Sequence, residues 1–194
     1  MLPANCGLLL ADHGTGQAET LLMRLIRGTG VSGAAGMQSQ RRFGLGEMFR
    51  PFLDLTRRQL EQAAQELKLS WVEDPSNQNS DYTRNFIRQQ VAPLIESRWA
   101  GWDKNIAKGS ARFAEADELL KELADADILK LVESQKLDLT AFAQLSLARR
   151  KNVIYRWLGK YLQMVPSSDL VEQLASLALD AKGEWLVSSI TLHA

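Results

Sequence analysis

The chain has 194 residues, a formal net charge of zero, 45% hydrophobic residues and 24% charged residues, which is the composition of a globular protein of one or two domains. The balanced charge excludes a global field that would draw the chain onto nucleic acid, so such a role would need local basic patches. A single cysteine, Cys6, excludes an internal disulfide, and no apolar run approaches the ~20 residues of a membrane span. We therefore expect a cytoplasmic protein without a membrane partner.

The first clear pattern is the apolar run at residues 6–11, which predicts a buried parallel strand with Cys6 in the core. A polar turn follows, and a helix is predicted from Gly16 to Arg27, with Gly28 as its stop. In α/β sheets the ligand crevice lies beyond the carboxyl ends of the strands, where a helix start offers free N–H groups. The turn is therefore the best site candidate. Such a strand needs neighbours, so it either pairs downstream or lacks strands that precede it, and we favour the second alternative.

Two side chains at this turn are candidates for chemistry. His13 directly follows the strand, and Glu19 lies in the first helical turn. A lone histidine is more often a plain loop residue than a catalyst, and an acid at this place often only complements the helix dipole. The sequence contains no Walker-type loop, dinucleotide fingerprint, metalloprotease motif or paired cysteines, so the residues alone leave both alternatives open.

The next part of the chain is predicted to contain a strand and a helix after a glycine-rich segment at residues 28–36. Residues 41–49 favour one short strand. Thr56 and Gln59 form a capping-box pattern, which predicts a helix that extends to about residue 67.

A further helix is predicted over residues 82–97, with a kink or break at Pro93. Arg84 and Arg88 are four residues apart and therefore share a face of this helix. Arginines in such a pattern suit phosphate binding, although most exposed arginines only interact with solvent. The same two alternatives apply to the basic group Arg149, Arg150, Lys151 and Arg156.

The character of the sequence changes near residue 100, where we place a domain boundary between residues 1–99 and 100–194. A long helix is predicted over 103–132, and another begins at Ser146 with an apolar inward face. The tail at residues 185–192 alternates loosely and favours a strand. The second domain is therefore predicted to be mainly helical.

Several segments, taken in order, resemble one family. They are residues 17–30 (QAETLLMRLIRGTG), 33–37 (GAAGM), 50–53 (RPFL), 71–77 (WVEDPSN) and 84–88 (RNFIR). This combination and its approximate spacing resemble tRNA(Ile)-lysidine synthetase, and the second half is similar to the helical tRNA-substrate domain of that family. The resemblance covers nearly the whole chain.

The resemblance implies an α/β remnant, the C-terminal part of a PP-loop, adenine-nucleotide alpha-hydrolase-like domain, over residues 1–99. A mainly α-helical tRNA-substrate-binding domain follows over residues 100–194, and the resemblance allows this domain to be incomplete at its C-terminal end. Members of the family use ATP and Mg²⁺ to adenylate the wobble cytidine of tRNA(Ile), and free lysine then displaces AMP to give lysidine. They are commonly homodimeric. The resemblance implies Glu19 and Arg84 as catalytic residues, His13, Arg27, Gly28 and Arg88 as substrate- or nucleotide-binding residues, and no metal ligand.

Two departures from the family pattern weaken the expectation of activity. The Ser-Gly-Gly-x-Asp-Ser nucleotide loop does not occur in these residues, and His-His-x-Asp-Asp has become Asp-His-Gly-Thr-Gly over residues 12–16. Thr15 and Gly16 therefore stand where two acids are expected, and a hydroxyl and a hydrogen cannot replace two carboxylates at a hard cation. We expect an N-terminally truncated synthetase that binds ATP and Mg²⁺ unproductively and is inactive alone. The alternatives are a non-catalytic tRNA-binding module and a decaying gene product whose Leu8–Leu10 strand lies on an open sheet edge.

Overall fold

The computed structural model describes residues 3, 5–72, 81–133, 136–162, 166–176, 184–187 and 190–193. Backbone contacts divide the chain into two compact units, Met1–Asp117 and Glu118–Ala194. Helix α6 (Trp102–Leu131) contributes residues to both units. The long helix predicted over 103–132 is confirmed, and the domain assignment at 1–99 and 100–194 stays a prediction.

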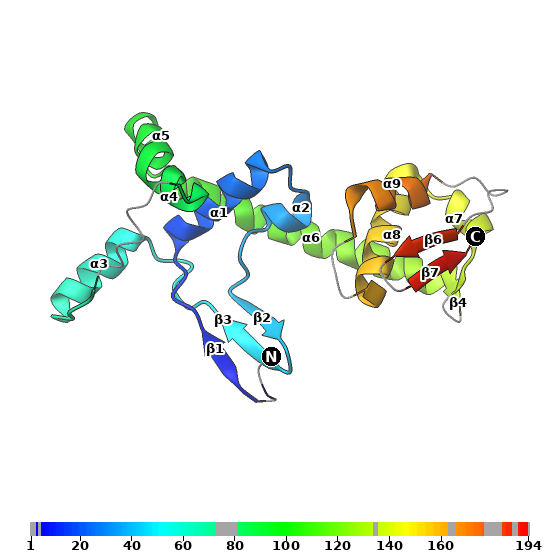
Figure 1. Ribbon diagram of the computed structural model, residues 1–194, viewed down its shortest axis with the longest axis horizontal. Helices are drawn as coiled ribbons and strands as arrows, with labels where there is room; N and C mark the ends of the chain where they lie inside the picture. The colour runs from blue at the N-terminus through cyan, green and yellow to red at the C-terminus, as the bar shows by residue number, and fades with distance from the viewer. Residues whose placement is uncertain are drawn as a thin grey trace. The chain divides into compact units, whose positions relative to one another are not determined.

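The first unit contains a small mixed sheet with the strand order β1-β3-β2 (Figure 1). β1 (Gly7–Leu9) pairs in parallel with β3 (Gly46–Phe49), and β2 (Gln40–Phe43) runs antiparallel to β3. The single strand predicted at 41–49 is therefore wrong. Gly44, at φ 68°, makes the turn that divides the segment into a hairpin.

β1 pairs with a downstream strand, which is the alternative that the sequence analysis disfavoured. The prediction of a buried strand is wrong, because Leu9 is 72% exposed and Cys6 is exposed. Among the described strands β1 has one neighbour and lies at the sheet edge. A strand in that position presents unpaired backbone groups and buries little side-chain surface.

Side-chain caps define the starts of α1 (Gly14–Ile26) and α3 (Arg57–Glu66) in the first unit. α1 begins two residues before the predicted start, because His13 is its N-cap. α2 (Val31–Ala34) is a single turn. α3 has the predicted capping box of Thr56 and Gln59, but none of its residues is buried.

The helix predicted over 82–97 is present with an interruption. It consists of α4 (Thr83–Phe86), a π-helical segment η2 (Ile87–Val91) and α5 (Ala92–Arg98). Pro93 lies in the first turn of α5, where its missing N–H cannot serve the α-helical ladder of the preceding turn. The predicted break at Pro93 is confirmed in this form.

The second unit is mostly helical. α7 (Leu139–Ala143), α8 (Leu147–Leu162) and α9 (Ser168–Ala175) accompany the hairpins β4 (Val132–Glu133) with β5 (Lys136–Leu137) and β6 (Glu184–Val187) with β7 (Ile190–His193). Its core is formed by Leu131, Phe142, Val153, Ile154, Leu158, Val171 and Leu174. The predicted inward face of α8 is confirmed for Val153, Ile154 and Leu158. The single strand predicted at 185–192 is wrong, because the described tail residues form the antiparallel pair of β6 and β7. No described helix combines the length and apolar character needed to cross a bilayer.

Candidate functional site

The turn after β1 is held tightly against the segment that follows β3. The Gly14 N–H donates to the Leu55 carbonyl oxygen at 2.7 Å. A Cβ at residue 14 would lie 2.9 Å from the Leu53 carbonyl oxygen, and backbone cannot easily move away. His13 then caps α1, because its Nδ1 accepts the Gly16 N–H at 3.2 Å. Glycine at 14 therefore permits the close approach that places His13 and α1.

Glu19 is the most deeply buried charged group of this region, with 1% of its surface exposed. Its carboxylate accepts from Arg84 Nε at 3.0 Å, and from Arg88 through Nε at 2.8 Å and Nη2 at 2.9 Å. Arg84 lies on α4 and Arg88 on η2, so the two arginines reach α1 from consecutive helical turns. Both oxygens of Glu19 are therefore engaged by guanidinium groups.

The electrostatics of the cluster follow from this arrangement. Burial disfavours the charged form of Glu19, but the hydrogen bonds from Arg88 and Arg84 outweigh it, so the pKa of Glu19 lies below its usual value. The same contact raises the pKa of Arg88. Burial lowers the pKa of His13; Glu19 opposes this shift, and Arg88, Arg57 and Arg84 add to it. The first shift favours the carboxylate form of Glu19, and the second favours the neutral form of His13.

The structure brings four of the six predicted site residues together, namely His13, Glu19, Arg84 and Arg88. It does not bring Arg27 and Gly28 to them. Arg27 is the C-cap of α1 and is exposed, and Gly28 follows with φ 77° and no atom near its Cβ position. Eight residues of helix separate Glu19 from Arg27, which is about 12 Å along the axis.

The donor groups around residues 12–19 do not fit a magnesium ion. A hard cation needs free carboxylate or carbonyl oxygens. The Asp12 Oδ2 accepts from Arg50 Nε at 2.7 Å, and Glu19 is held by two arginines. The Thr15 hydroxyl donates to Asp103 Oδ2 at 3.0 Å. Within the described residues, no group of three histidine, cysteine or acidic side chains is placed to hold a metal.

Sequence reasoning missed a second set of contacts that fixes the glycine-rich segment. The Gln17 Oε1 accepts the Met37 N–H at 2.7 Å, and its Nε2 donates to the Met37 carbonyl at 3.1 Å. Arg24 Nη1 donates to the carbonyl oxygens of Gly33 and Gly36, at 2.8 and 2.9 Å. The periodicity of α1 gave no signal for these contacts, because their partners are backbone groups of a turn.

Three of the four basic residues predicted as a phosphate-binding group on α8 are instead paired with acids. Arg149 makes a bidentate pair with Asp127, and Arg156 makes another with Asp125. Lys151 pairs with Glu172. The pKa of Asp125 is lowered, first by its hydrogen bond from Arg156. These cations serve contacts within the second unit.

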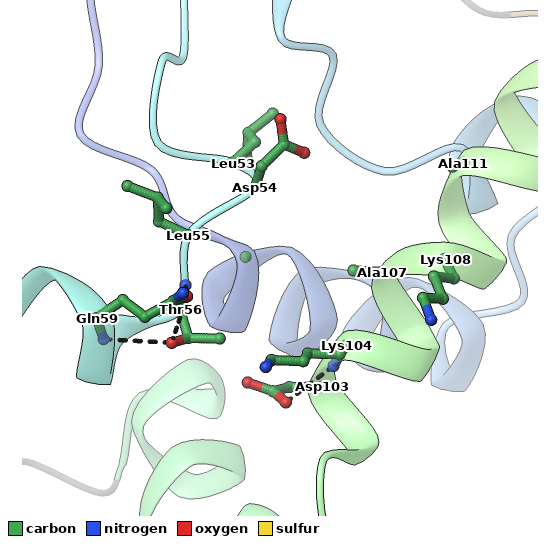
Figure 2. Close-up of a pocket in the computed structure, with 11 residues that line it drawn as sticks. Leu53, Asp54, Leu55, Thr56, Gln59, Asp103, Lys104, Ala107, Lys108 and Ala111 are labelled. Atoms are coloured by element: carbon green, nitrogen blue, oxygen red, sulfur yellow. Dashed lines mark hydrogen bonds between the residues drawn. The ribbon is translucent and has the colours of Figure 1, made fainter.

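A separate cleft of about 430 Å³ lies beside the N-terminal turns of α6 (Figure 2). Its lining includes Gly14, the loop at 53–56 and the α6 residues Asp103, Lys104 and Lys108. The Gln59 side chain at its edge is occupied by the capping box. Of the residues of α1, Gly14 lines this cleft.

Comparison with known proteins defines the class of the chain. A PP-loop domain model matches residues 3–95, and a TilS substrate binding domain model matches residues 137–193. The chain thus has a PP-loop domain in its N-terminal half, followed by a TilS substrate binding domain.

The relatives agree with both models. The chain is 41% identical to tRNA(Ile)-lysidine synthase of Pseudomonas syringae over 96% of its own length and 44% of the relative. It is 41% identical to that of Pseudomonas fluorescens over 98% of the chain and 45% of the relative. It is 37% identical to that of Proteus mirabilis over 89% of the chain and 40% of the relative. The chain is therefore similar to tRNA(Ile)-lysidine synthases over nearly its whole length, and it spans less than half the length of these relatives.

Proposed function

We propose that this chain contributes to lysidine formation on tRNA(Ile), the reaction for which its relatives are named. The substrates would be the tRNA, ATP and free lysine. The second unit, with its TilS substrate binding domain match, would contact the tRNA, and the PP-loop domain would belong to the nucleotide-activating part. The compartment we propose is the cytoplasm.

We further propose that the chain does not ligate lysine by itself. The observation that carries this proposal is the state of the carboxylates next to α1. Asp12 is paired with Arg50, Glu19 is buried beneath Arg84 and Arg88, and position 16 has no side chain. No free carboxylate of this turn is left to organise a cation or an attacking amine, so we propose that ATP and Mg²⁺ are not bound productively.

The Glu19 cluster would then position other groups instead of reacting. A buried carboxylate between two arginines fixes both guanidinium groups against α1. Arg84 keeps 41% of its side chain exposed in this arrangement, so it remains available to an anion from solvent. We propose that Glu19 orients Arg84 toward nucleotide or tRNA phosphate. A direct role of Glu19 with the lysine ammonium stays a prediction.

A ligation assay tests the proposal. Purified chain is incubated with tRNA(Ile), ATP, Mg²⁺ and labelled lysine, and label in the tRNA is measured beside a full-length synthase as the positive control. We expect incorporation at the level of a reaction without enzyme. Turnover near that of the full-length enzyme would refute the proposal.

A non-catalytic tRNA-binding module is the second candidate. It is favoured by the TilS substrate binding domain match, which does not depend on the acids of the catalytic turn. Filter binding to tRNA(Ile) and to an unrelated tRNA distinguishes this candidate. Preferential binding of tRNA(Ile) without ligation is the expected result, and equal binding of both would count against a specific module.

A further inference from the structure

Three basic side chains lie along one side of α6 in the first unit. Lys104, Lys108 and Arg112 are spaced by four residues, so each step advances about 6 Å along the axis and turns only about 40°. All three residues are exposed. We call these three residues the α6 ridge.

The ridge borders a concave surface. Lys104 and Lys108 both line the cleft beside the loop at 53–56, and Figure 2 shows them on the same side of α6. Two acids, Asp54 and Asp103, also line this cleft. Asp103 is tied to the Thr15 hydroxyl and to the Lys104 N–H, and the ridge continues past both acids to Arg112.

The part of the chain that the structure describes provides no ion-pair partner for the ridge cations. Among the described residues, no ion pair joins Lys104, Lys108 or Arg112 to a carboxylate. Arg84 and Arg149, by contrast, each hold a buried acid. A lysine in the first turn of a helix is also disfavoured by the helix dipole. Stability of α6 therefore does not explain the position of Lys104.

We propose that the α6 ridge binds the phosphodiester backbone of RNA. The inference rests on the proposed function, because it assigns a contact surface for the same RNA substrate. It adds a site outside both family matches, since α6 residues 104–112 lie between residues 95 and 137. Evenly spaced cations on one helix side read charge and not bases, so the contact is independent of sequence.

The experiment measures binding of the full chain to tRNA(Ile) and to an unrelated RNA stem-loop at several salt concentrations. The variant is K104Q/K108Q/R112Q. The matched control is R42Q/R58Q/K68Q, which removes three exposed cations of the first unit that lie outside the ridge. Each phosphate contact contributes a slope of about −0.7 to −0.9 in log affinity against log salt. Circular dichroism melts verify that the variants fold.

The ridge predicts a specific difference in salt dependence. Between about 50 and 200 mM salt the wild type should lose about 20- to 40-fold more affinity than the ridge variant K104Q/K108Q/R112Q, for both RNAs, whereas the control R42Q/R58Q/K68Q should follow the wild type. Salt-dependent tRNA binding with equal slopes for the wild type and the ridge variant would overturn the ridge and leave the proposed function standing. Ridge-dependent binding without preference for tRNA(Ile) supports the ridge and counts against the proposed function. Binding of neither RNA overturns both.

Discussion

Gly16 lies directly beneath the guanidinium group of Arg84. A Cβ placed at residue 16 would be 2.7 Å from Arg84 Nη2, although Arg84 is 68 positions further along the chain. The absence of a side chain at 16 thus permits the position from which Arg84 reaches Glu19. Gly16 is one of the two residues that depart from the family pattern, and it also leaves the space that the Arg84 side chain occupies.

Aspartate and alanine at residue 16 should differ in their effect. Both variants, G16D and G16A, displace Arg84 by the same Cβ contact, but only the aspartate offers it a new anionic partner. It also places an acid in the first turn of α1. We expect G16D to be more stable than G16A by about 0.5–1 kcal/mol. Urea unfolding measures the difference, and equal midpoints would show that Arg84 does not respond to charge at this position.

Removal of the Glu19 charge should strongly destabilise the first unit. E19Q leaves two arginines against a buried amide, and breaking a buried pair of this kind costs about 3 kcal/mol. The matched control is E61Q, whose partner Arg57 lies on an exposed helix surface and whose loss costs about 0.5 kcal/mol or less. Denaturant unfolding measures the loss of stability of both variants, through the shift in midpoint at an unchanged m-value. Similar losses for the two variants would mean that the Glu19 cluster is not a buried pair in solution.

The His13 cap should make stability depend on pH. The pKa of His13 in the folded chain lies below its ordinary value of 6.5. As the pH falls through that value, the unfolded chain binds a proton that the folded chain resists, so the free energy of unfolding decreases. The imidazolium also cannot accept the Gly16 N–H at Nδ1.

H13N separates this effect from other titrations, because asparagine caps helices well and does not titrate. The free energy of unfolding of the wild type should fall between about pH 7.5 and pH 5.5, and that of H13N should fall less. The same decrease in both proteins would assign the pH dependence to other groups.

The Thr15 hydroxyl should stabilise the start of three helices. It donates to Asp103 on α6 and accepts the N–H of Arg57 at the start of α3. T15V keeps the shape and removes both contacts, at an expected cost of about 1–2 kcal/mol. T15S retains the hydroxyl and should lose less. A thermal melt of the two variants checks the order, and an equally stable T15V would show that the hydroxyl contributes nothing.

The sequence predicts the helices of this protein better than its strands. Helix signals are local, and the capping box of Thr56 and Gln59 and the break before Pro93 are both present as expected. The strand signals failed because burial depends on neighbours. The apolar run around Leu9 predicts a core strand only if the sheet continues on both sides, and β1 lies at the edge of the described sheet.

The sequence predicts which residues belong to the Glu19 cluster, but it does not predict the contacts between them. Glu19, Arg84 and Arg88 follow from the resemblance, but 65 residues separate Glu19 from Arg84, and no sequence pattern states that they pair. The α8 arginines show the same limit. Their spacing suits phosphate binding, yet Asp127 and Asp125 on the facing helix neutralise Arg149 and Arg156. Which cations are free is a property of the tertiary structure.

The contacts of Gln17 give the Gln-Ala-Glu-Thr motif at residues 17–20 a structural interpretation. Only a glutamine at 17 offers both an acceptor and a donor at the reach that Met37 requires, since glutamate lacks the donor and asparagine is a methylene shorter. Ala18 is completely enclosed, and Thr20 bonds the Gly16 carbonyl. Each residue of the motif therefore has a structural role in holding α1 in place. The presence of this motif in a sequence therefore indicates how α1 packs. It does not by itself indicate that the chain carries out the chemistry of its relatives.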